Sequence, residues 1–197
     1  MQAIKNFYLY LLLSTSLIGG VIAQSSYSIF PEESELTIYG TSTLHDWQIV
    51  AEKMDGKCTV VLRDGTIETV NKLGFEVDVD GLKSGKSGMD DNTIKALHQD
   101  EYPSIRFKLK SVERTAASSD QESTILVTKG MLTVTDFTKE INLKVAGKMN
   151  ADGSIQFIGR TVFNMTDFKI DPPTAVFGTI ETGDEITIIF KIVFKKK

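Results

Sequence analysis

Two histidines and one cysteine are the most reactive side chains in this sequence of 197 residues. Catalysis by cysteine or serine needs a base within hydrogen-bond reach of the nucleophile. Cys58 lies in an alternating apolar stretch, and neither His45 nor His98 accompanies a nucleophile-elbow sequence. We therefore predict no catalytic residues, and we interpret Cys58 as a small buried apolar residue.

A metal site is the next chemistry to consider, because His45, Asp46 and the Asp90-Asp91 pair are potential ligands. Adjacent residues of a strand point to opposite faces, so His45 and Asp46 cannot both bind one ion without a bulge. No glycine-rich loop leads from a strand into a helix, so nucleotide binding has no support. We expect neither a metal nor a cofactor.

The first 23 residues differ from the rest of the chain. Lys5 precedes an uncharged stretch from Phe7 to Ile22, and Ala23 closes it, which is the pattern of a secretory signal peptide. The stretch is too short for a comfortable membrane span. We predict cleavage after Ala23, export to the periplasm or beyond, no stable membrane insertion, and one mature domain over residues 24–197.

Charge and cysteine content narrow the partners and the source of stability. The full chain carries a net charge of −4. A modest acidic balance of this kind offers little to nucleic acid, so we expect no nucleic-acid partner. A single cysteine permits no internal disulfide, and stability must come from core burial. The sequence leaves homodimer formation open.

Alternation of apolar and polar residues dominates the mature sequence, for example in residues 75–79, 141–145 and 186–192. This period of two is typical of half-buried strands. Between such runs Asp-Gly pairs recur at 55–56, 64–65, 80–81 and 152–153, and they suit tight hairpin turns. The pattern predicts an all-β fold, an antiparallel barrel or sandwich. One short helix is expected near residues 89–99, before Pro103.

The predicted inward faces are rich in large apolar residues. Gly40 and Gly159 fall among them and could leave room inside. A barrel of about eight strands can be filled by its side chains or can hold one small ligand. These residues alone therefore support either a packed core or a binding cavity. The inward candidates are Ile38, Trp47, Ile49, Phe75, Val77, Phe107, Leu143, Val145, Phe157, Ile188 and Phe190.

A less regular segment over residues 167–183 contains Phe168 and Phe177. Pro172 and Pro173 exclude it from a central strand. Such an aromatic loop can either line an opening of the barrel or cap its core.

Four blocks in order resemble the YceI-like family of exported, lipocalin-like barrels. They are GTSTLHDW at 40–47, LKSG at 82–85 with the helix after it, EYPSIRF at 101–107, and GMLTV at 130–134 followed by TKEI. The resemblance spans residues 27–194. It implies an antiparallel lipocalin-like β-barrel of about eight main strands that binds a polyisoprenoid or a related long-chain amphiphile.

The resemblance also implies where a lipid tail would lie. The tail would thread into the barrel, with Leu97 of the helix and Phe168 and Phe177 of the aromatic loop beside the mouth. His45 would contact a head group or brace the barrel. We therefore expect a protein without enzymatic activity that carries or sequesters a polyisoprenoid, an isoprenoid quinone or a fatty-acid derivative. The alternative is an envelope stress or interaction protein with a filled barrel.

Overall fold

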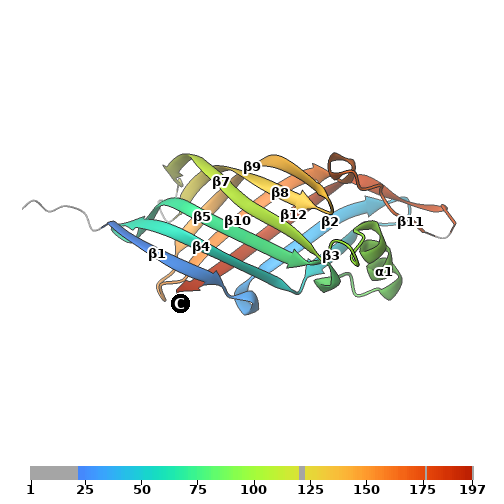
Figure 1. The fold of residues 1–197 in the computed structure, drawn as a ribbon, viewed down its shortest axis with the longest axis horizontal. Coiled ribbons are helices and arrows are strands. Elements are labelled where there is room, and N and C mark those ends of the chain that lie inside the picture. Colours follow the sequence, from blue (N-terminus) through green and yellow to red (C-terminus); the bar gives the residue numbers. More distant parts are fainter. Residues whose placement is uncertain (1–21, 120–122, 176, 197) are drawn as a thin grey trace, which may run out of the picture.

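The computed structural model describes residues 22–119, 123–175 and 177–196, and most of these residues lie in β-strands (Figure 1). Residues 1–21 of the predicted signal peptide lie outside the described residues. The strands are β1 (Ile22–Ile29), β2 (Glu35–Ser42), β3 (Trp47–Ala51), β4 (Met54–Arg63), β5 (Thr66–Asp78), β6 (Leu82–Lys83), β7 (Ser104–Ala117), β8 (Thr124–Val134), β9 (Phe137–Met149), β10 (Ile155–Asn164), β11 (Thr174–Ala175) and β12 (Ile180–Lys196). The helical elements are α1 (Ser87–Ala96) and the 3-10 turns η1 (Pro31–Glu33), η2 (Val79–Gly81) and η3 (Met165–Phe168).

The sheet closes on itself as a barrel. Antiparallel pairing runs in the order β1, β4, β5, β7, β8, β9, β10 and β12, and β12 also pairs with β1. β2, β3 and β6 continue β1, β4 and β5 across short breaks, because β2 pairs with β3 and β3 pairs with β6. The described chain therefore forms eight long strands in up-and-down order, which confirms the predicted barrel.

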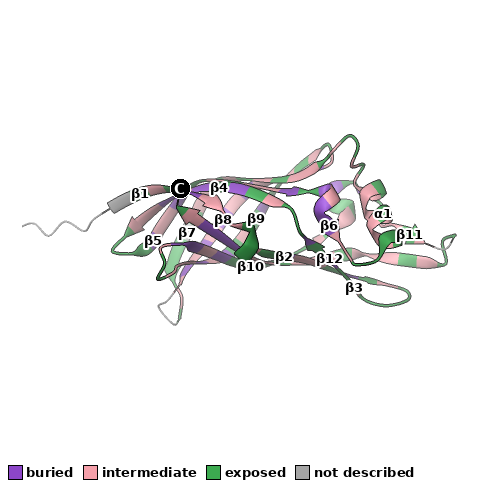
Figure 2. Ribbon diagram, turned by 90° about the horizontal axis from the view of Figure 1, so that it is seen from below, coloured by how far each residue is buried: buried purple, intermediate pink, exposed green. Residues whose placement is uncertain are grey.

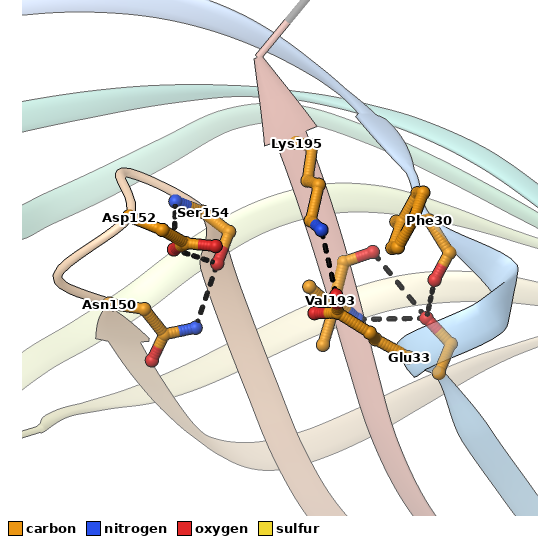
Figure 3. A network of polar contacts seen from close by, with 8 residues as sticks. Phe30, Glu33, Asn150, Asp152, Ser154, Val193 and Lys195 are labelled. Atoms are coloured by element: carbon orange, nitrogen blue, oxygen red, sulfur yellow. Dashed lines mark hydrogen bonds and ion pairs between the residues drawn. The ribbon is translucent and has the colours of Figure 1, made fainter.

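Closure depends on β12, which changes partner along its length. Its central part pairs with β2, whereas its last residues pair with β1. At the break between β1 and β2, the Ser34 hydroxyl donates to the Phe30 carbonyl at 2.8 Å and accepts from the Val193 amide at 3.0 Å (Figure 3). The Lys195 ammonium lies over the Phe30 ring and 2.7 Å from Glu33. These contacts satisfy backbone groups where the ladder changes.

Two of the four Asp-Gly pairs form the hairpin turns predicted for them. Asp64 and Gly65 both have positive φ between β4 and β5, and Gly153 has φ +81° between β9 and β10. The pair at 80–81 lies in the 3-10 turn η2 between β5 and β6, so it does not form the hairpin turn predicted for it. The prediction for 55–56 was wrong, because both residues lie inside β4. A residue with a side chain would not fit at position 56, because its Cβ would lie 2.9 Å from the Gly74 carbonyl oxygen.

Glycines on the inner wall lie under aromatic rings. Gly40 pairs with Trp47, and Gly159 pairs with Phe190. A Cβ at Gly40 would lie 2.1 Å from the Trp47 ring, and one at Gly159 would lie 2.4 Å from the Phe190 ring. The sequence suggested that these two glycines could leave room inside the barrel. The structure shows instead that aromatic rings occupy the space beside them. The glycines let large rings lie flat along the wall.

One end of the barrel is packed solid. Val60, Ile155 and Phe194 are fully buried there, and Phe157 packs edge-on against Phe194 at 5.9 Å. Cys58 belongs to the same core, as predicted, and burial raises the pKa of its thiol to about 12. A thiol with this pKa stays protonated and unreactive near neutral pH.

The other end carries α1, the short helix that the sequence placed near 89–99. It begins at Ser87 and ends at Ala96, so it lies two to three residues earlier than predicted. None of its residues is fully buried, and Figure 2 shows it in the colours of intermediate and exposed residues beside β6. In Figure 1, α1 lies at the end opposite the C-terminus.

Because the Phe190 ring lies against Gly159, we expect the effect of a Gly→Ala substitution on stability to depend strongly on its position in the barrel. Gly159→Ala forces the Phe190 ring to move and is expected to lower the free energy of unfolding by about 1–3 kcal/mol. Gly74→Ala in β5 is the matched control, because nothing lies within 4 Å of its Cβ position. Urea denaturation measures both changes, and equal stabilities of the two variants would contradict the packing described.

Candidate functional site

The barrel encloses a cavity of about 540 Å³ toward the end that carries α1. The inward faces of β2, β3, β5, β7, β8, β10 and β12 form its wall. One face of α1, the β2–β3 turn and the segment that includes β11 form its rim. A volume of this size lies within the range of small-molecule sites in proteins.

A second cavity of about 150 Å³ lies deeper in the barrel. Its wall is apolar except for Thr128 and Thr161, and the Thr128 hydroxyl donates to the Leu143 carbonyl. Six residues from six strands line both cavities, so the two adjoin across one ring of side chains. That ring consists of Leu36, Phe75, Phe107, Leu132, Phe163 and Ile188.

The structure brings together all but one of the residues that the sequence proposed for the cavity. The larger cavity is lined by His45, Ile38, Trp47, Ile49, Phe75, Val77, Leu97, Phe107, Phe168 and Ile188. The smaller cavity is lined by Leu143, Val145, Phe157 and Phe190, together with Phe75, Phe107 and Ile188. The strand residues among them lie on the inward face that period-two alternation predicted, whereas His45, Leu97 and Phe168 lie outside the strands.

Phe177 is the exception. It lies fully exposed, with φ +55°, and lines neither cavity. The sequence analysis expected it beside the mouth; it lies in the turn between β11 and β12, outside the residues that line either cavity.

Phe168 both lines the cavity and belongs to a packed cluster. Its ring meets Phe163 edge-on at 5.6 Å and Phe137 at 6.5 Å. The Lys139 ammonium lies 2.7 Å from the neighbouring Asp167 carboxylate, and this contact lowers the pKa of Asp167. The sequence left open whether the aromatic segment lines the opening of the barrel or caps its core, and the segment does both in part. Phe168 caps a hydrophobic cluster and forms part of the cavity wall.

Several lining residues were missed by the sequence analysis. Leu36 lies two residues from Ile38 and Phe163 lies four residues from Gly159, so extending the predicted inward alternation of these two strands would have found them. Leu132 lies in β8, a strand for which no inward residue was predicted. Lys86 and Met89 line the rim from the start of α1. No local pattern marks them, because their place depends on how α1 packs across the barrel end.

Trp47 and His45 occupy the hairpin between β2 and β3. The Trp47 indole N–H donates to the Thr41 carbonyl at 2.9 Å, which fixes the ring over Gly40. His45 was expected in a strand, but it lies in the turn before β3 and is exposed. Its Nδ1 lies 2.8 Å from the Asp46 carbonyl oxygen, and its Nε2 lies 3.4 Å from the Lys86 ammonium.

The described residues contain no group of three potential metal ligands among histidine, cysteine and acidic side chains. They also contain no helix that is long and apolar enough to cross a membrane.

Comparison with known proteins gives a consistent result. A family model described as the YceI-like domain matches residues 27–194. No curated protein matches the chain.

Solved structures similar to this one include three from bacteria. Burkholderia cenocepacia BcnA is 14% identical with a TM-score of 0.65, and the match covers 84% of this chain and 98% of that one. A polyisoprenoid-binding domain from Saccharophagus degradans is 8% identical with a TM-score of 0.67, and the match covers 87% and 98%. A mutant of the Campylobacter jejuni YceI protein is 18% identical with a TM-score of 0.54, covering 74% and 85%. At these identities the likeness establishes the fold.

The opposite environments of two phenylalanines in the aromatic segment lead to a matched prediction. Phe168→Ala removes a ring that is 4% exposed and is expected to lower the free energy of unfolding by about 3–5 kcal/mol. Phe177→Ala removes an exposed ring and should change it by less than about 0.5 kcal/mol. Chemical denaturation followed by circular dichroism distinguishes them, and a comparable loss in both variants would contradict the placement of Phe177.

Proposed function

We propose that this chain, which belongs to the family of YceI-like domains, binds a long-chain apolar lipid inside its barrel and performs no chemistry on it. The observation that carries this proposal is the pair of adjoining cavities, whose walls are the apolar inward faces of the strands. A polyisoprenoid, an isoprenoid quinone or a fatty-acid derivative would each supply a chain for this space. The similar Saccharophagus degradans domain is described as polyisoprenoid-binding, which supports the same class of ligand.

Burial of a hydrocarbon tail is a sufficient source of affinity. Each methylene removed from water contributes about 0.8 kcal/mol. Ten methylenes would therefore contribute about 8 kcal/mol before ordering costs, which corresponds to a gross micromolar affinity. Few polar contacts are required, and the lining offers few.

Two other functions have less support. An interaction protein with a filled barrel requires side chains to occupy the interior, whereas about 540 Å³ is open here. An enzyme acting on the buried part of a lipid requires a reactive group inside the barrel. The deeper cavity has no titratable residue among the described residues that line it. A non-catalytic carrier or sequestering protein agrees best with both observations.

From the predicted signal peptide we further propose that this activity lies outside the cytoplasm. Export after cleavage near Ala23 would bring the protein into the periplasm or the medium, where a lipid leaving a membrane needs an apolar enclosure to cross water.

Direct extraction tests the proposed function. Protein purified from its own source without detergent is expected to release about one long-chain compound per chain into organic solvent, as measured by mass spectrometry. An empty extract from protein that is folded by circular dichroism would contradict the carrier function.

Neighbouring residues of β12 allow a sharper test of the cavity. Ile188 points into both cavities, whereas Ile189 points outward and is 44% exposed. Ile188→Trp should block the passage between the two cavities. It should weaken binding of the neutral fluorescent probe N-phenyl-1-naphthylamine by about tenfold or more. Ile189→Trp should leave probe binding unchanged. Equal binding by both variants would show that the probe does not enter the barrel.

A further inference from the structure

We propose that the mouth of the larger cavity selects lipids with an anionic head group, a carboxylate or a phosphate, which the Lys86 ammonium binds. This inference rests on the proposed function and specifies the head of the ligand rather than its tail. Four features of the rim carry it: the sign of the charge in the lining, the state of His45, the loop that holds Lys86, and the orientation of α1.

The charge of the cavity lining is opposite to that of the chain. The chain contains 26 acidic and 22 basic residues. Among the described residues that line the larger cavity, however, Lys86 is the only lysine or arginine, and none is aspartate or glutamate. An anion at the mouth would therefore meet one cation and no lining carboxylate. Attraction between such charges is stronger beside an apolar wall than in open water.

The bonds of His45 leave Lys86 able to bind a ligand. The Asp46 carbonyl oxygen lies 2.8 Å from Nδ1 and can only accept a hydrogen bond, which places a proton on Nδ1. In the neutral ring Nε2 is then an acceptor, and the Lys86 ammonium lies 3.4 Å from it. An ammonium has three donor hydrogens, so two remain for head-group oxygens. His45 therefore orients the ammonium, and it is a positioning residue.

The loop between β6 and α1 holds Lys86 at the rim. The amide and hydroxyl of Ser84 donate to one Asp90 carboxylate oxygen at 2.8 and 2.5 Å, and the Lys86 amide donates to the Ser84 hydroxyl at 3.1 Å. The hydrogen bonds from Ser84 lower the pKa of Asp90, so this carboxylate is ionised and bonded within the loop. Asp90 does not line the cavity.

The start of α1 adds a weaker contribution of the same sign. Lys86 is the N-cap residue of this helix, and Gly88 in its first turn lines the cavity. The N-terminus of a helix carries a partial positive charge and favours nearby anions. Apart from its chain neighbours and the backbone of α1 itself, no atom lies within 4 Å of a Cβ position at Gly88, so the approach to this turn is open.

A set of ligands with one chain length tests the inference. Palmitate, hexadecyl phosphate and 1-hexadecanol, each kept below the concentration at which it self-associates or separates from water, are titrated against full-length mature protein loaded with N-phenyl-1-naphthylamine. We expect the wild type to bind at least one of the two anions about tenfold more tightly than the alcohol, because a hydrogen bond to a charged group is stronger than one to a neutral group. The two anionic arms show whether a carboxylate or a phosphate is preferred.

Three variants assign the preference to its residue. Lys86→Met should lower the ratio of anion to alcohol affinity to about one, and Lys86→Arg should retain most of it. Lys95→Met is the matched control, because Lys95 lies on the same helix but does not line the cavity, and this variant should keep the wild-type ratio.

Each remaining outcome decides against a specific statement. If the wild type binds hexadecanol as tightly as both anions, the head-group inference is overturned and the proposed lipid binding stands. If Lys86→Met keeps the preference, Lys86 is not its source and the inference is overturned. If the folded wild type binds neither the probe nor any of the three ligands, the proposed function fails, and the inference fails with it.

Discussion

Closure of the sheet through β12 is the constraint on which the rest of this structure depends. Along its length β12 forms antiparallel pairs with β10 on one side and with β2 and then β1 on the other. Among the described residues the main ladder is therefore closed around the barrel. Once the ring is closed, each strand has one face inside, and the period of two assigns every second residue to the interior. The apolar character of the cavity follows from this geometry.

The size of the interior depends on pairs of large and small residues across strands. Trp47 lies over Gly40, and Phe190 lies over Gly159. Such pairs flatten the rings against the wall, so bulky residues line the barrel without filling it. At the opposite end Phe157 and Phe194 pack against each other and close the interior. Phenylalanine therefore lines the side of the cavity at Phe190 and closes its lower end at Phe157 and Phe194.

The sequence predicted the features that follow from local rules. Alternation identified the inward faces of Ile38, Phe75 and Ile188, because a strand in a closed barrel has no other way to bury an apolar face. It did not predict what depends on neighbours distant in the chain. The glycine at 56 looked like a turn residue, but it lies inside β4, where the neighbouring strand β5 approaches it too closely for a side chain. Lys86 reached the rim only through the packing of α1 and the bonds of Ser84.

An apolar cavity of this size constrains what can occupy it. An unoccupied apolar wall forfeits the dispersion contacts and the burial of apolar surface that a bound chain would supply, and this loss is a cost to the folded state. Water would fill the space poorly, because a buried water needs two to four polar partners and the wall offers few. A bound hydrocarbon removes this cost, so ligand binding and folding stability are expected to be strongly coupled.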